Sequence, residues 1–328
     1  MRAEIVMACR KELPRNLRLT VQNIKATMSQ DDGMEVVLDG PHDGIDYRLK
    51  EMNTIQPFDH PRGPGQCRNY SITESAADIV IIVDAHMSFP VGWIDAICAH
   101  LAKHPKDVTC CHMIGVDHNW RPVDDGGIYD GCHLEQRLPH PSEKNWWINS
   151  VWNKFALPHG VVGSIMGACY GITRQWYETI GNPLAILEAW GGDEEILSAA
   201  SWLMGGRCYL LPPICKHIWA APRLRPPEIE YTERYEMWGN HYAMLEALPV
   251  GDPEREIMRK HMDKSNNRIE KVAERVAVRA DAINHLRETL AGAPRTWEDL
   301  KTMGVIQPVG AKEFKIAVKK PRRGKKQI

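Results

Sequence analysis

The stretch Ile79-Val80-Ile81-Ile82-Val83-Asp84-Ala85-His86 decides the fold. Its first five residues are all apolar, so both faces of the segment favour burial, which is typical of a strand in the middle of a parallel sheet. An acid and an imidazole follow at the carboxyl end of this strand, where open α/β sheets bind their ligands. The stretch therefore predicts a central strand over 78–83 that carries polar side chains to a site.

Strand and helix patterns alternate on both sides of this segment. Short apolar runs predict strands over 4–9, 34–38, 108–114 and 207–211. Apolar residues at helical spacing predict helices over 13–28, 65–77, 92–104, 174–180 and 194–204. Such alternation, with right-handed crossovers, predicts a doubly wound α/β (Rossmann-like) sheet flanked by helices.

The pattern changes after a proline-rich stretch at 222–227. Helical spacing predicts one helix over 228–248 and one long helix over 253–290, which together form a C-terminal helical extension. We expect three parts: a sheet domain over 1–222, the extension over 223–292, and a basic, partly disordered tail over 293–328.

Composition excludes several protein classes. The 328 residues are 43% hydrophobic with a net charge of −1, which is enough apolar material for a sizeable core and excludes global disorder. No run of about 18 apolar residues is present, so we expect no membrane span. The N-terminus lacks the apolar core of a signal peptide, because Arg10, Lys11 and Glu12 interrupt it. Nine cysteines without a CxxC pair favour reduced thiols and a cytoplasmic location, in a host cell if the chain is viral.

The charge is unevenly distributed along the chain. Residues 311–328 carry a net charge of +7, and the remaining 310 residues carry −8. A basic tail on an acidic body suggests a polyanionic partner, although a solubilising disordered end explains it equally well. The segment 117–159 has no clear periodicity and is rich in Gly, Pro, His and Trp, with tryptophans at Trp120, Trp146, Trp147 and Trp152. So long an irregular segment in a compact domain is more often functional than idle.

Three groups of residues could carry chemistry. Asp84 and His86 are spaced i and i+2, so on an extended chain they point the same way and could share one divalent cation such as Mn²⁺. The alternative is an aspartate that caps the next turn beside an incidental histidine. The segment Trp190-Gly191-Gly192-Asp193-Glu194-Glu195 places three acids at a helix start, where capping is again an alternative, but its glycines allow a turn that brings the acids against a ligand. His217, after the strand at 207–211, offers a further imidazole ligand or a structural histidine.

Taken together, Asp39-Gly40, Gly65-Pro-Gly-Gln-Cys-Arg68-Asn69, Asp84-Ala-His86, Trp190-Gly-Gly-Asp193-Glu194 and His217 resemble the motifs of GT-A-fold glycosyltransferases. The resemblance covers roughly residues 3–220. It is closest to family-2-like enzymes and to the polypeptide N-acetylgalactosaminyltransferases. It implies a metal-dependent transfer of a sugar from a nucleotide-diphosphate donor, such as a UDP-sugar, to an acceptor hydroxyl. With neither a membrane anchor nor a lectin-like domain after residue 220, we expect a soluble enzyme of bacterial or viral type.

The resemblance also implies roles for individual residues. Asp84, His86 and His217 would hold Mn²⁺ or Mg²⁺, which would bridge the donor phosphates. The donor would lie against Ala8, Arg10, Asp39, Gly65, Arg68, Asn69, Asp84, Ala85, Gly167, Trp190, Gly191 and Gly192. Asp193 or Glu194 would take the proton from the acceptor hydroxyl. Here the acids are in the order Asp-Glu where family-2 motifs have Glu-Asp, so the two roles stay open, as does the stereochemistry.

The acceptor is predicted from charge and aromatic content alone. The basic tail and the Trp-rich segment suit DNA, in which a flipped-out hydroxymethylated pyrimidine would offer the hydroxyl. Protein Ser/Thr, a small molecule and a saccharide are the other acceptors. Two rival functions are a nucleotidyltransferase, for which the chain lacks a Gly-rich loop after its first strand, and a non-catalytic nucleic-acid-binding scaffold. An oligomer is possible.

Overall fold

The computed structural model of the chain describes residues 1–41, 53–117, 119–123, 128–137, 147–152, 160–218, 234–265 and 269–309. The expected boundary at 222–227, Trp146 and the basic residues 311–328 lie outside these ranges. Among the described helices, none is long and apolar enough to cross a bilayer.

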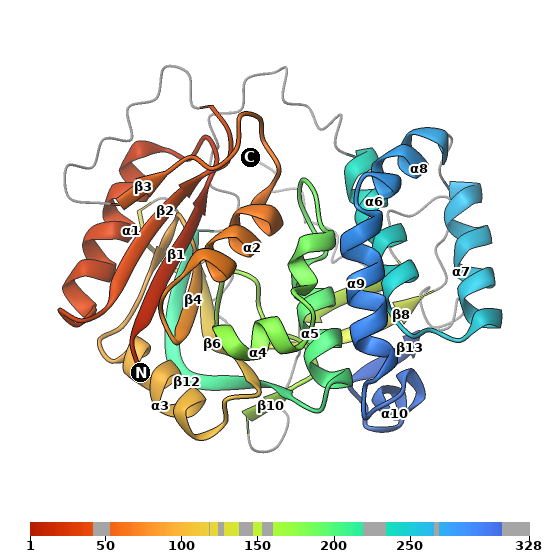
Figure 1. Cartoon of the computed structure of the whole chain (residues 1–328). Coiled ribbons are helices and arrows are strands. Elements are labelled where there is room, and N and C mark those ends of the chain that lie inside the picture. Colours follow the sequence, from red (N-terminus) through yellow and green to blue (C-terminus); the bar gives the residue numbers. More distant parts are fainter. Residues whose placement is uncertain are drawn as a thin grey trace, which may run out of the picture.

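A large mixed sheet forms the centre of the molecule (Figure 1). Its strand order is β10-β12-β6-β11-β4-β1-β2-β3, with β5 paired to β12 and β7 paired to β6. The bounds are β1 Ala3–Cys9, β2 Gly33–Leu38, β3 Asn53–Ile55, β4 Ile79–Asp84, β5 Met87–Ser88, β6 Asp107–Val116, β7 Ile128–Tyr129, β10 Val161–Val162, β11 Cys169–Thr173 and β12 Arg207–Ile218. The segment 79–83 is wholly buried in β4, between β1 and β11, which confirms its predicted central place.

Helices cover both faces of this sheet, as the predicted GT-A-type α/β fold requires (Figure 1). One face carries α1 Pro14–Thr27 and α3 Trp93–Lys103. The other carries α2 Pro64–Glu74, α4 Arg174–Thr179, the short 3₁₀ helix η3 Pro183–Ile186 and α5 Asp193–Leu203. The strands β1, β2, β3 and β4 run parallel, while β11 runs antiparallel to β4 and to β6. The carboxyl ends of β1 and β4 therefore lie side by side, with Ala8 opposite Asp84.

The segment 117–159, in which we saw no periodicity, contains regular strands. β8 Cys132–Arg137 pairs antiparallel with β9 Ile148–Trp152, and β13 Ile306–Val309 adds to β8 in parallel to complete a small second sheet. β8 does alternate between buried and partly exposed positions, but one of its buried residues is Gln136, whose polar side chain disguised the alternation. Gln136 is satisfied by contacts with Trp297 and Glu254 from the C-terminal part of the chain.

The helical extension contains α6 Arg234–Ala247, α7 Asp252–Ser265, α8 Ile269–Ala277 and α9 Ala280–Ala291, which lie beside one another at the side of the large sheet (Figure 1). The prediction of one helix over 253–290 is wrong, since the chain forms three. Between α8 and α9 the chain turns at Arg279, whose side chain is 4% exposed. The beginning of the expected tail is folded, as α10 Trp297–Thr302 and β13. The division into three domains stays a prediction.

Candidate active site

Asp84, His86 and His217 meet at the carboxyl edge of the large sheet. One ligand atom from each of the three lies within 4.8 Å of the other two. His217 Nε2 is 3.2 Å from Asp84 Oδ2, and the two imidazole rings have centroids 4.8 Å apart. Carboxylate oxygen and imidazole nitrogen are suitable donors for Mn²⁺, so this donor set fits a divalent cation.

The backbone explains why a histidine so distant in sequence arrives here. We expected a strand that ended at residue 211, with His217 beyond it, but β12 continues to Ile218 after an irregularity between Leu211 and Ile214. Its last residues pair antiparallel with β5, which places His217 opposite Met87. The amide of Ile218 then donates to the carbonyl of His86. This pairing holds the two histidines side by side.

Glu12, which was not among the predicted site residues, contacts His86 from the side of the first helix. Its Oε2 lies 2.9 Å from His86 Nδ1, and its Oε1 accepts hydrogen bonds from the Leu13 amide and the Asn16 side chain. Burial opposes ionisation of Glu12, but its hydrogen bond with His86 holds its pKa below the usual value. A carboxylate at Nδ1 selects the tautomer with its lone pair on Nε2, the nitrogen that would face a metal. The signal that could have revealed Glu12 is its place among the polar residues directly after the first strand.

Arg68 links the cluster of Asp84, His86 and His217 to the acids that follow the Trp-Gly-Gly segment. This residue of α2 is 5% exposed, and its Nη2 donates to Asp84 Oδ1 over 2.9 Å. Its Nη1 is paired with Asp193 Oδ2. Burial opposes ionisation of Asp84, yet the hydrogen bond from His217 and the charge of Arg68 keep its pKa well below the usual range. The guanidinium thus fixes the distance between two carboxylates predicted to serve different steps.

Glu194 faces the loop before β11. Its Oε1 accepts a hydrogen bond of 2.6 Å from the amide of Gly167. A Cβ at Gly167 would lie 2.6 Å from the same oxygen, so only glycine allows this approach. We expected Gly167 to lie against the donor; in the structure its amide also holds Glu194. Burial and the neighbouring Glu195 and Asp193 raise the pKa of Glu194 well above its usual value.

The other predicted donor residues are distributed around this centre. The oxygens of Asp39, which is 2% exposed, accept from the amides of Arg62 and Gly63, and Arg10 lies 3.9 Å away. Three more of these positions also have protein neighbours. The carbonyl of Ala85 accepts from the hydroxyl of Thr20, and a Cβ at Gly65 would touch Leu187. Asn69 Oδ1 accepts from the hydroxyl of Tyr177. The Asn69 side chain therefore contacts α4. Gly191 and Gly192 form the turn before α5, and Trp190 is half exposed there.

Comparisons with known proteins agree with this arrangement. The sequence model of Glycosyl transferase family 2 matches residues 4–178, more than half of the chain. The chain belongs to glycosyl transferase family 2. This family-2 chain is 24% identical over 253 residues to N-acetylgalactosaminyltransferase 6 of Drosophila melanogaster, with 66% of the chain and 36% of that protein covered. It is 23% identical over 229 residues to polypeptide N-acetylgalactosaminyltransferase 8 of the same fly, with the same two coverages. The family-2 chain thus spans about a third of the length of these relatives.

A solved structure of GalNAc-T7 with UDP, GalNAc and Mn²⁺ has the same fold as the family-2 chain. The TM-score is 0.66 at 14% identity, over 92% of this chain and 57% of that one. Because the match includes 92% of this chain, it extends well beyond the residues matched by the family model. The predicted GT-A fold is confirmed.

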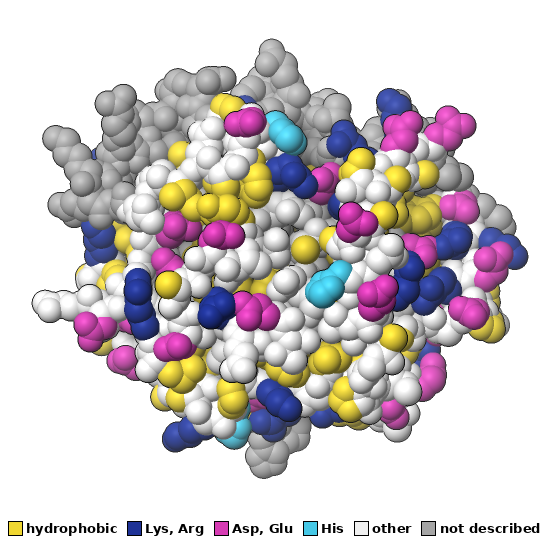
Figure 2. Space-filling view, in the orientation of Figure 1, with side chains coloured by type: hydrophobic (Ala, Val, Ile, Leu, Met, Phe, Trp, Pro, Cys, Tyr) yellow, Lys and Arg dark blue, Asp and Glu magenta, His cyan; other side chains and the backbone are white. Residues whose placement is uncertain are grey.

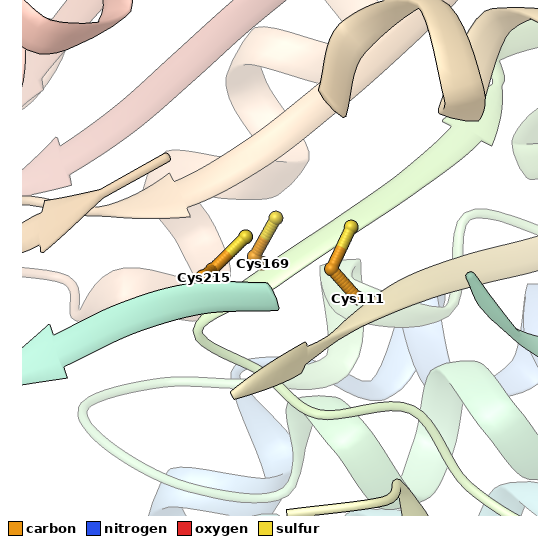
Figure 3. Close-up of side chains that lie close together, drawn as sticks. All are labelled: Cys111, Cys169 and Cys215. Carbon is orange, nitrogen blue, oxygen red and sulfur yellow. The ribbon is translucent and has the colours of Figure 1, made fainter. Parts of the chain in front are cut away.

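A second cluster in the family-2 chain consists of Cys111, Cys169 and Cys215, which come from β6, β11 and β12 (Figure 3). The three sulfurs lie within 4.8 Å of one another and all three residues are buried. All nine cysteines are free thiols, in agreement with the expected reduced state. Buried cysteine packs as a small apolar side chain, and thiolates in an apolar core would be costly. We therefore assign this cluster to the packing of three adjacent strands.

Glu195, next to Glu194, makes the stability of the fold depend on pH. Its carboxylate accepts from the Ser150 amide, and burial raises its pKa from 4.5 to about 7. The folded state thus binds this proton more tightly than the unfolded state does, so the free energy of unfolding falls as pH rises through this range. We expect Glu195→Gln to be more stable than the wild type at pH 8 by up to about 3 kcal/mol, and no more stable at pH 4.

Urea unfolding at the two pH values measures this difference. The matched control is Glu178→Gln, which removes a carboxylate from an exposed pair with Arg174 on α4. Its free energy of unfolding should change between the two pH values as much as that of the wild type. If the free energy of unfolding of Glu195→Gln changed with pH as much as that of the wild type, Glu195 would have to be ionised in the folded state at neutral pH.

Proposed function

We propose that the chain transfers a sugar from a nucleotide-diphosphate donor, a UDP-sugar, to an acceptor hydroxyl, with Mn²⁺ or Mg²⁺ held by Asp84, His86 and His217. The observation that carries the proposal is the meeting of these three residues at the carboxyl edge of the sheet, with Arg68 between Asp84 and Asp193. Membership of a glycosyltransferase family supports it, as does a fold shared with an enzyme solved with UDP, GalNAc and Mn²⁺.

The proposed division of labour follows from the contacts. When bound, the cation would neutralise the charge that develops on the departing nucleoside diphosphate. Glu12 orients His86, and Arg68 holds Asp84 in its ionised form. Glu194 is the proposed acceptor of the hydroxyl proton, because a carboxylate with a raised pKa is a stronger base once it is ionised. Asp193, through its ion pair with Arg68, would hold the start of α5 at a fixed distance from Asp84.

A calorimetric titration of UDP in the presence and absence of Mn²⁺ tests donor binding directly. We expect metal-dependent binding by the wild type and its loss in His217→Ala. A screen of nucleotide sugars for hydrolysis with Mn²⁺ then identifies the donor. Nucleotide binding that does not depend on metal would contradict the proposed ligand set, and the absence of any nucleotide binding would favour the scaffold function.

Glu12→Gln probes the group behind the metal ligand. The amide keeps the size of the side chain but removes the charge that fixes the His86 tautomer, so we expect Mn²⁺ affinity to fall by about 10-fold to 100-fold. Glu135→Gln provides the control, because it alters a similar carboxylate–histidine contact with His133 in β8. Equal Mn²⁺ affinity in the Glu12 variant and the wild type would mean that Glu12 has no part in the site.

For the acceptor, we propose a polyanion such as DNA carrying a hydroxymethylated pyrimidine, with protein Ser/Thr or a saccharide as the alternatives. The support is the basic segment 311–328. The Trp-rich segment gives less support than expected, because Trp147 is fully buried and donates to the carbonyl of His241. On the face seen in Figure 2, basic and acidic side chains are interspersed. In the helical extension, Arg259 and Arg287 both pair with Glu246.

A gel shift with duplex DNA, using the full chain and a version that lacks 311–328, tests this acceptor. We expect binding that weakens steeply with salt and is lost with the tail. Binding that is absent or insensitive to salt would overturn the DNA proposal and direct the search to peptide and saccharide acceptors.

A further inference from the structure

The segment that leads into α5 has an unfavourable backbone. Ala189, Gly191 and Gly192 have φ values of 54°, 96° and 94°, so three of the four residues before Asp193 are in the left-handed region. Glycine adopts this region readily, but alanine does not. Such a conformation persists only where neighbouring groups fix it. The orientation of Asp193 and Glu194 therefore depends on whatever holds residues 188–192.

Asn240, on α6 of the helical extension, makes the central contacts with this segment. Its Oδ1 accepts from the Glu188 amide over 2.9 Å, and its Nδ2 donates to the carbonyls of Glu188 and Gly191 over 2.7 and 2.8 Å. The side chain is completely buried. An amide is the only neutral side-chain group that can donate twice and accept at the same time. The contacts thus use the particular chemistry of asparagine.

Arg279 holds Asn240 from behind. Its Nη1 donates to Asn240 Oδ1 and to the carbonyl of Ile186, both over 2.7 Å. A Cβ at Gly239 would lie 2.5 Å from Arg279 Nη2, so the glycine next to Asn240 gives the guanidinium its space. The turn between α8 and α9 that brings Arg279 inward is the same one that breaks the long helix expected from the sequence.

The opposite side of the segment is held by the sheet domain. Arg62 Nη2 is 2.8 Å from Glu188 Oε1, and the carbonyl of Arg62 accepts from the Ala189 amide. The backbone amide of Arg62 in turn donates to the carboxylate of Asp39. The turn before α5 is therefore clamped between the N-terminal sheet and the C-terminal helices.

We propose that Asn240 is a positioning residue for sugar transfer, which acts by fixing the turn that orients Asp193 and Glu194. The proposal rests on the proposed function. It makes the helical extension a working part of the transfer site, although the extension lies beyond the residues matched by the family model.

Asn240→Leu and Asn240→Asp test this role. Leucine keeps the approximate shape and removes all hydrogen bonds; aspartate keeps the acceptor and removes both donors. We expect kcat to fall by about 10-fold to 100-fold in each, with the KM for the donor changed by less than about threefold, because displacement of a reacting group by about 1 Å costs on this scale. Arg287→Ala, which cuts another contact of α9 with α6 at the carbonyl of Glu246, is the matched control and should keep wild-type kcat.

Hydrogen exchange measured on peptides that cover 183–196 supplies a readout independent of activity. Exchange there should accelerate in both Asn240 variants, while peptides from β1 and β4 exchange as in the wild type. Wild-type kcat in Asn240→Leu, or an equal loss in Arg287→Ala, would overturn the proposal. If the leucine variant does not fold, the aspartate variant decides. If the wild type transfers no sugar, the proposed function fails. Unchanged hydrogen exchange in 183–196 in the Asn240 variants would separately refute the claim that Asn240 fixes the turn before α5.

Discussion

Asp84→Ala should lower kcat/KM for sugar transfer by about 1,000-fold or more, and it should leave the fold intact. Asp84 is a proposed metal ligand and also the partner of Arg68 and His217, so its removal takes away several kcal/mol of charge stabilisation at the departing diphosphate. The fold should survive because the apolar core of β4 is Ile79–Val83 and because Arg68 keeps a second carboxylate partner in Asp193. Steady-state kinetics and thermal melting measure the two effects.

The control for Asp84 is a histidine–carboxylate contact elsewhere in the sheet. His100 of α3 lies 2.9 Å from Asp107, the first residue of β6, at the end of that strand remote from His217. His100→Ala should reduce stability but keep kcat/KM within about threefold of the wild type, because it touches none of the proposed ligands. Full activity in Asp84→Ala would remove this residue from the mechanism and the metal site with it.

Local sequence patterns were enough to predict the centre of the fold, and together with the family resemblance they singled out the residues of the candidate metal cluster. The apolar run at 79–83 predicted a central strand, and the polar residues that follow strands predicted Asp84 and His86, because strand period and burial are local properties. Arg68 was expected to lie along the donor, and its ion pair with Asp84 became evident only in the structure.

The features that were not predicted depend on contacts between distant parts of the chain. β12 continues to His217 because it pairs with β6 and β5, neither of which is near it in sequence. The buried side of β8 contains Gln136, which is satisfied by Trp297 about 160 residues later. At the break between α8 and α9, Arg279 donates to the carbonyl of Ile186 in η3 and to Oδ1 of Asn240 on α6, and helical periodicity alone does not register this gain. Glu12 was visible as a polar residue after a strand, but its partner became evident only in three dimensions.

Glu194→Gln is expected to lower kcat by about 100-fold to 10,000-fold, the usual contribution of a general base. Glutamine keeps an oxygen to accept from the Gly167 amide, so the local geometry should be preserved while the ability to take a proton is lost. Since burial and the neighbouring acids raise the pKa of Glu194, activity of the wild type should increase with pH as this group ionises. Glu194→Ala should lose at least as much activity.

Glu195→Gln is the matched control for Glu194→Gln. Both residues are acids in the first turn of α5 and both accept a backbone hydrogen bond, but Glu195 is bonded to Ser150 in β9 and Glu194 to Gly167 beside β11. Only the Glu194 variant should lose kcat and the rise of activity with pH. Loss of kcat in Asp193→Asn, with full activity in Glu194→Gln, would transfer the role of the base to Asp193. Its ion pair with Arg68 would then have to open before the acceptor proton could be taken.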